Sequence, residues 1–117
     1  LYHMGMPRVR VAGVIGKNNP NAWMNLCWTH IISQRMTVSA LDEYIDMIPL
    51  NKIIGFGGDY SSRCLEKVYG HLKMAREDIA EVLGRRIDRG VMGHEEAVEI
   101  CRLWLYENPK QLYKLDV

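Results

Sequence analysis

The sequence contains few cysteines, and none is placed for a disulfide framework or a structural zinc site. Cys27, Cys64 and Cys101 are odd in number and widely spaced, and no CxxC pair occurs. Disulfide-rich domains and zinc modules need paired or closely spaced cysteines. We therefore expect reduced, packed thiols, although Cys27 lies near a predicted strand end, where it could contact a pocket.

The chain also lacks a dominant charge, a long apolar run and an internal repeat. Fifteen basic residues are balanced by fourteen acidic ones, and the two signs are interspersed. This balance argues against nucleic acid and anionic membranes as partners. No apolar run reaches the length of a membrane span, and the N-terminus lacks the regions of a signal peptide. The sequence therefore predicts a soluble, cytoplasmic protein.

The 117 residues have the size and composition of one globular domain, with 48% hydrophobic and 25% charged residues. Leu1 and Tyr2 are interpreted as the tail of a strand, and the apolar runs 22–28 and 52–56 predict two buried strands. Helical patterns predict helices that start at Pro7, cover about 38–48, run from Ser61 or Ser62 to about Asp88, cover about 94–106 and start again at Asn108.

This order alternates strands with helices over the first half of the chain. Such alternation is typical of parallel strands joined by right-handed crossovers, so the predicted fold class is α/β. Two complete strands and one strand tail make only a small sheet with unpaired edges. We therefore interpret the sequence as part of a larger architecture.

The stretch from Asn51 to Tyr60 contains the strongest candidate for chemistry. A short apolar strand is followed by Gly57 and Gly58 and then by Asp59. Ligands gather at the C-terminal edge of a parallel sheet, and two glycines leave room for a ligand near the main chain. Asp59 is thus predicted to be a metal ligand or a general base. From this stretch alone, an aspartate that caps the next helix is an equally good interpretation.

Three stretches together resemble a known enzyme superfamily. They are His3–Pro7, Asn18–Trp28 and Asn51–Tyr60. They are similar to the C-terminal part of the amidohydrolase superfamily, nearest to its metal-dependent hydrolases and decarboxylases, with the uronate isomerases more distant. The tail Glu107–Tyr113 is similar to the final helix of that group.

The resemblance covers essentially the whole chain and implies the C-terminal segment of a (β/α)8 TIM barrel. It would run from the end of the sixth strand through the eighth, followed by long C-terminal helices. The chain would be a single partial domain, in which residues 1–60 supply barrel strands and crossover helices and residues 61–117 supply the C-terminal helices. Its sheet edges would be covered by copies of itself or by the missing part of the barrel, so an oligomer is expected.

The resemblance also implies a catalytic metal site. Asp59 matches the acid that ends the eighth strand, and His3 matches the histidine that ends the sixth. Both are predicted as catalytic residues and as ligands of a divalent metal, with Zn²⁺ the first choice, in the full-length protein. The metal would lower the pKa of water to about 7, and the two side chains would take up the proton. The ligands from earlier strands have no counterpart here, so the isolated chain is predicted to be inactive.

The sequence therefore predicts a metal-dependent hydrolase of the amidohydrolase type acting on a small polar molecule. A decarboxylase or an enzyme like a uronate isomerase is an alternative function. A further alternative is a non-catalytic interaction module that binds through its two long amphipathic helices.

Other polar and aromatic residues have a structural interpretation beside a functional one. His30 could contact substrate or could be hydrogen-bonded within a loop. We expect the remaining histidines to lie on the surface, the tryptophans to lie in the core and three arginines to form a solvated helix end. These residues are His71, His94, Trp23, Trp28, Trp104, Arg85, Arg86 and Arg89.

Overall fold

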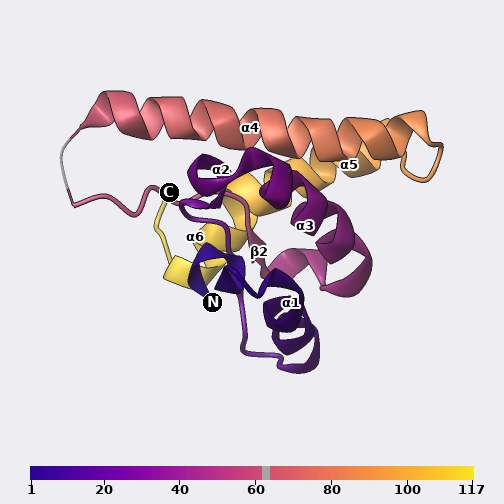
Figure 1. Cartoon of the computed structure of the whole chain (residues 1–117), viewed down its shortest axis with the longest axis horizontal. Coiled ribbons are helices and arrows are strands. Elements are labelled where there is room, and N and C mark those ends of the chain that lie inside the picture. Colours follow the sequence, from indigo (N-terminus) through magenta and orange to yellow (C-terminus); the bar gives the residue numbers. More distant parts are fainter. Residues whose placement is uncertain (62–63) are drawn as a thin grey trace.

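The computed structural model describes residues 1–61 and 64–117, most of which are helical. Its radius of gyration is 13.6 Å, close to the roughly 13 Å expected for a globular chain of this length. The helices are η1 (Tyr2–Gly5), α1 (Val9–Asn18), α2 (Thr29–Ile32), α3 (Gln34–Met47), η2 (Leu50–Lys52), α4 (Leu65–Asp88), α5 (His94–Arg102), η3 (Leu103–Glu107) and α6 (Asn108–Tyr113). In Figure 1, α4 crosses above α2 and α3.

Only two very short strands are present in the described residues. β1 (Met24–Asn25) pairs in parallel with β2 (Ile53–Ile54). The prediction of an α/β TIM-barrel segment, with strands over 22–28 and 52–56, is therefore wrong. β1 stops early because the Asn25 side chain, not a neighbouring strand, accepts the Cys27 N–H at 2.8 Å.

The edges of this small sheet are covered by the chain itself. On one side the Leu1 carbonyl accepts the Asn25 N–H, so Leu1 lies beside β1 while Tyr2 belongs to η1 rather than to a strand. On the other side the Trp104 carbonyl accepts the Gly55 N–H at 2.9 Å. The buried Asn108 amide donates to the carbonyls of Leu50 and Ile53, and so closes the same edge.

A π-helical turn makes the Trp104 carbonyl available for that contact. In η3, the Asn108 N–H bonds the Leu103 carbonyl, five residues back. The same pattern would pair the Trp104 carbonyl with residue 109, which is a proline and has no N–H to donate. Pro109 thus leaves the Trp104 carbonyl free to bond the sheet edge. Asn108 supplies the side-chain amide that bonds the carbonyls of Leu50 and Ile53.

Helix α1 packs through its glycines rather than through the apolar residues that suggested it. Val11 and Val14 are exposed, whereas Gly13 and Gly16 face the core. A Cβ on Gly13 would lie 2.2 Å from Met47 Cε and 2.9 Å from Tyr44 Cε1. Close approach to α3 therefore requires glycine here. The spacing of Val11, Val14 and Ile15 predicts an inward apolar stripe, and this prediction is wrong, because all three side chains are exposed.

The second half of the chain follows its predicted helices more closely. α4 ends at Asp88 and α6 begins at Asn108, as expected. α3 begins earlier than predicted, at Gln34, because the Ser33 hydroxyl caps its N-terminus by accepting the Met36 N–H. Ser62, one of the two predicted caps of the long helix, lies outside the described residues.

One arginine expected in solvent is buried between α3 and α4. The Arg86 guanidinium donates to the carboxylates of Asp42 and Asp46 at 2.6–2.7 Å. The Arg86 hydrogen bonds lower the pKa of Asp46. Arg86 therefore joins the two longest helices, and the prediction of a solvated helix end is wrong for this residue.

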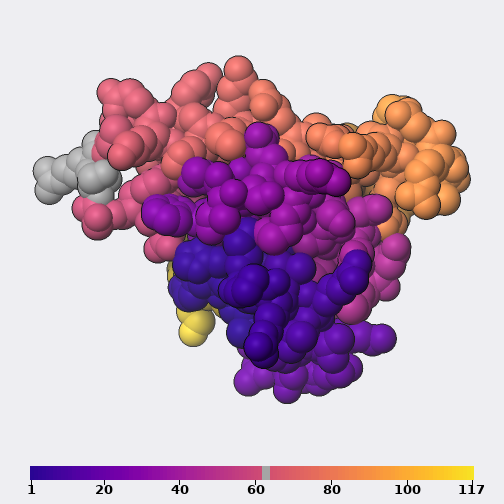
Figure 2. All heavy atoms as spheres, viewed as in Figure 1, coloured from indigo at the N-terminus to yellow at the C-terminus, as the bar shows by residue number. Residues whose placement is uncertain are grey.

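The two ends of α4 extend beyond the body of the molecule (Figure 2). Near its N-terminus, Leu65 and Tyr69 are 77% and 72% exposed. In the part of the chain that the structure describes, no helix combines the length and the apolar character needed to cross a membrane.

Candidate metal centre

The structure brings His3 and Asp59 into direct contact, although 55 residues of sequence separate them. His3 lies in η1, and Asp59 follows β2 after the two glycines. His3 Nε2 lies 2.9 Å from Asp59 Oδ2. Their side chains are 40% and 51% exposed, so the pair is open to solvent and to a ligand.

Cys27 is the third member of this cluster. Its Sγ, a ring nitrogen of His3 and a carboxylate oxygen of Asp59 lie within 4.8 Å of one another. Cys27 follows β1 by two residues and is buried. The thiol thus forms the inner side of the cluster, and the imidazole and the carboxylate form its open side. We refer to these three residues as the candidate metal centre, or metal centre for short.

The local sequence positions the thiol. Asn25 Oδ1 accepts a hydrogen bond from the Cys27 N–H, and Asn25 Nδ2 donates one to the Tyr113 hydroxyl of α6. A Cβ on Gly57 would lie 2.7 Å from Cys27 Cβ and 3.1 Å from Asn25 Oδ1. Gly57 therefore lets the segment after β2 pass against Cys27, and this approach places Asp59 beside it.

The backbone is strained around this centre. The non-glycine residues shown with positive φ are His3 (55°), Met4 (53°), Trp28 (61°), Asp59 (48°) and Lys114 (52°). The first four belong to the metal centre or directly follow its members in sequence. Such conformations cost about 1 kcal/mol or more each and cluster at functional sites.

The alternative of Asp59 as a helix cap does not fit the structure. α4 begins at Leu65, and its N-cap position is occupied by Cys64. Asp59 lies five residues before Cys64 and contacts His3 instead. Its carboxylate is therefore available for chemistry at the cluster.

The Cys27 thiol is held in its protonated form. Burial raises its pKa, and the nearby Asp59 carboxylate raises it further, against a hydrogen bond from the His3 backbone that lowers it. A cation bound beside the sulfur would reverse this balance, because metal coordination deprotonates a thiol.

His30 belongs to a separate, closed cluster. Its Nδ1 lies 2.8 Å from Asp78 Oδ2, and its Nε2 lies 3.0 Å from the Gly55 carbonyl. The Gln34 amide donates to the other Asp78 oxygen at 2.9 Å. The His30 and Asp78 side chains are each 3% exposed. His30 is thus a hydrogen-bonded structural residue, located in α2.

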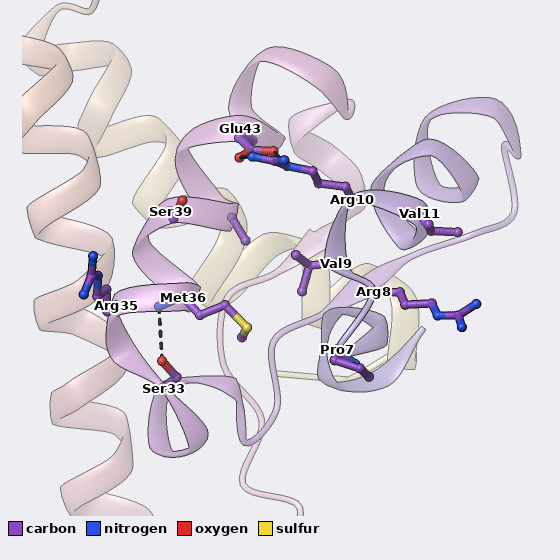
Figure 3. A pocket seen from close by; sticks show the side chains of 11 residues that line it. Pro7, Arg8, Val9, Arg10, Val11, Ser33, Arg35, Met36, Ser39 and Glu43 are labelled. Atoms are coloured by element: carbon purple, nitrogen blue, oxygen red, sulfur yellow. Dashed lines mark hydrogen bonds and ion pairs between the residues drawn. The ribbon is translucent and has the colours of Figure 1, made fainter.

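A hollow of about 550 Å³ between α1 and α3 is a weaker candidate site. Figure 3 shows that its arginines do not converge. Arg10 is bound to Glu43 by two hydrogen bonds of 2.8 and 2.9 Å, while Arg8 and Arg35 point outward on opposite sides. An anion in this hollow would therefore meet no common group of donors.

Sequence reasoning missed several residues near the metal centre. Trp28, predicted in the core, is 42% exposed. His71, predicted on the surface, has an Nδ1 atom shielded from solvent beside Tyr60. Cys27 was expected only as a possible pocket contact. The one available signal was position, since Cys27 and Trp28 end the apolar run 22–28.

No family model matches the chain, and neither a curated protein nor a solved structure matches it. The resemblance to the amidohydrolase superfamily is therefore not supported, and the helical fold with two short strands contradicts it. The stretches around His3 and Asp59 nevertheless meet in space. The site has to be interpreted from its own geometry.

Proposed function

We propose that the chain binds one divalent cation through His3, Cys27 and Asp59 and hydrolyses a small polar molecule at this cation. Zn²⁺ is the first choice for the cation. The observation that carries this proposal is the convergence of an imidazole nitrogen, a thiol and a carboxylate oxygen within 4.8 Å. These three groups come from segments far apart in the sequence.

The donor set fits a catalytic zinc site. Zn²⁺ accepts imidazole, thiolate and carboxylate ligands, and catalytic sites use three protein ligands with one open position. Donors around a tetrahedral zinc lie roughly 3.3–3.8 Å apart. A bound ion would therefore replace the 2.9 Å hydrogen bond between His3 and Asp59 and draw the three groups, now within 4.8 Å of one another, around itself. With Cys27 the chain itself supplies three groups, whereas the sequence predicted only His3 and Asp59.

The bound cation would supply a Lewis acid and lower the pKa of water to about 7. His3 would hold the cation through one ring nitrogen. The Asp59 oxygen that does not contact the cation would accept a proton from the attacking water and return it to the leaving atom. In this hydrolysis, the water oxygen bonds to the substrate carbonyl carbon. The bond between that carbon and the leaving group then breaks.

The same residue types also occur in cysteine hydrolases, but the geometry favours the metal. A nucleophilic cysteine needs a lowered pKa and a base that takes its proton. Burial raises the pKa of Cys27 instead, so the thiol is not activated as a nucleophile.

The test measures zinc stoichiometry by equilibrium dialysis and turnover of an activated ester with and without a chelator. We expect one Zn²⁺ per chain and turnover that the chelator abolishes. Asp59→Asn keeps the size and tolerates the positive φ of this position, but it removes the charge. It should reduce turnover at least about a hundredfold. Asp88→Asn, an exposed position at the end of α4, is the control. Normal turnover by Asp59→Asn, or turnover that survives the chelator, would contradict the proposal.

The exposed apolar residues at the start of α4 support a second candidate function, an interaction module or homo-oligomer. Leu65 and Tyr69 lie in the first two turns of α4 and are largely exposed, and such exposure is typical of contact surfaces. Sedimentation of the wild type and of the Leu65→Ser/Tyr69→Ser double variant tests this. Association that the double variant abolishes supports an interface, and monomers in both cases exclude self-association.

A further inference from the structure

A second pocket adjoins the metal centre and shares Asp59 with it. Its volume is about 400 Å³, within the range of small-molecule sites. Its lining residues come from the start of α2, from the segment after β2 and from α4. They are Trp28, Ile31, Asp59, Tyr60, Ser61, Lys67 and His71.

The wall of this pocket is aromatic. The rings of Trp28 and Tyr60 are 6.3 Å apart, and those of Tyr60 and His71 are 5.0 Å apart. Trp28 keeps 42% of its surface exposed. An exposed indole beside a phenol ring is suited to pack against a flat, apolar part of a ligand.

Two polar atoms of lining residues lack a partner among the residues that the structure describes. Tyr60 Oη and His71 Nδ1 are both shielded from solvent and make no hydrogen bond there. An unsatisfied buried polar group costs about 1–3 kcal/mol. A ligand that offers acceptors to both atoms, once rotation of the two side chains turns them toward the pocket, would remove this cost.

Lys67 adds a positive charge to the same side of the pocket. It lies one helical turn before His71 on α4, so the two side chains share a face of the helix. The ammonium, the phenol and the imidazole can all donate hydrogen bonds. Three donors in one place suit an anion.

We infer that this pocket binds the carboxylate of the substrate through Lys67, Tyr60 and His71, while Trp28 packs against a flat part of the same molecule. A carboxylate is favoured over a phosphate monoester, because a dianion would meet one lysine and the nearby charge of Asp59. The inference rests on the proposed function for the reaction itself. The substrate would then be a small carboxylic acid with a hydrolysable bond beside the metal centre.

The experiment measures binding in metal-free protein, so that it does not depend on the metal centre. The probes are benzoate, its neutral analogue benzamide, and phenyl phosphate, titrated in the presence of a chelator. The readout is the NMR signal of the Trp28 indole N–H, assigned with Trp28→Phe. We expect benzoate to shift this signal, and to bind about tenfold more tightly than either other probe. Equal binding of benzamide, tighter binding of phenyl phosphate, or no binding of benzoate would overturn the inference.

Two lysine variants locate the charge that matters. Lys67→Met should weaken benzoate binding about tenfold, whereas Lys73→Met, an exposed lysine of α4 outside this pocket, should leave it unchanged. An unchanged affinity in Lys67→Met would overturn the assignment of the carboxylate to this residue. A separate Zn²⁺ titration distinguishes the two proposals. Benzoate binding without zinc binding supports the pocket and contradicts the proposed function.

Discussion

The protein contains two His–Asp pairs of nearly equal length in opposite environments. His30 and Asp78 lie 2.8 Å apart in the interior, and His3 and Asp59 lie 2.9 Å apart at the surface. In the first pair both ring nitrogens face an acceptor and both carboxylate oxygens are engaged. The second pair has an open side and a thiol as its third member. The comparison shows how the same two side chains serve stability in a closed cluster and offer chemistry in an open one.

The largest expected effect concerns the closed pair. Asp78→Ala leaves the buried His30 without its carboxylate partner, so the free energy of unfolding should fall by about 3–5 kcal/mol. Asp59→Asn should change it by less than about 1 kcal/mol in metal-free protein, since that pair is exposed. Urea denaturation of both variants measures the difference. Glu77→Ala, next to Asp78 but exposed, is the control, and equal losses at the two aspartates would remove the contrast.

A smaller effect is expected at the glycine that packs against the metal centre. Gly57→Ala places a Cβ within 2.7 Å of Cys27 Cβ, which should push the thiol away from Asp59. We expect zinc affinity to fall about tenfold, the scale of disturbed ligand positioning. Gly70→Ala in α4, where a Cβ meets nothing within 4 Å, should leave zinc affinity unchanged and raise stability by about 0.5–1 kcal/mol. Unchanged zinc affinity in Gly57→Ala would show that this contact does not position Cys27.

The smallest expected effect concerns the ion pair between Arg86 and Asp46, whose exposure to solvent lies between those of the two His–Asp pairs. Arg86 is buried, whereas Asp46 is exposed, and the pKa of Asp46 is lowered by its hydrogen bonds to Arg86. A lowered folded-state pKa gives stability that is present above the unfolded value of about 3.9 and is lost as the pH falls through the folded value. As the pH falls from about 6 to 3, the free energy of unfolding should therefore decrease less in Arg86→Met than in the wild type. Identical pH profiles in thermal melts would contradict this.

The sequence predicted the helices of the second half better than the strands of the first. The apolar period over α4 spans many turns, Asp88 precedes a glycine-containing turn, and Asn108-Pro109 marks the start of α6. Short apolar runs such as 22–28 do not distinguish a strand from buried irregular chain. Here the strand ends because the Asn25 side chain accepts the Cys27 N–H. The periodicity of the sequence does not predict such a bond.

The candidate site was predictable only in part. His3 and Asp59 were expected at the same end of a sheet, and the structure places them 2.9 Å apart. The role of Cys27 depends on its approach to Gly57, a contact between segments 30 residues apart. The pocket beside it depends on where α4 passes, which brings His71 to Tyr60. Such contacts are set by tertiary packing and leave no local pattern.

The most direct test of the central claim is a Co²⁺ titration followed by absorption spectroscopy, because Co²⁺ occupies zinc sites and a thiolate ligand gives a strong charge-transfer band in the near ultraviolet. We predict this band at one Co²⁺ per wild-type chain, its loss in Cys27→Ser and its retention in Cys101→Ser. Cys101 is the control, a partly buried cysteine outside the cluster. His3→Gln should weaken Co²⁺ binding at least about a hundredfold, whereas His94→Gln should not. A wild-type titration without the band, or an undiminished band in Cys27→Ser, would contradict the assignment of these residues as a metal centre.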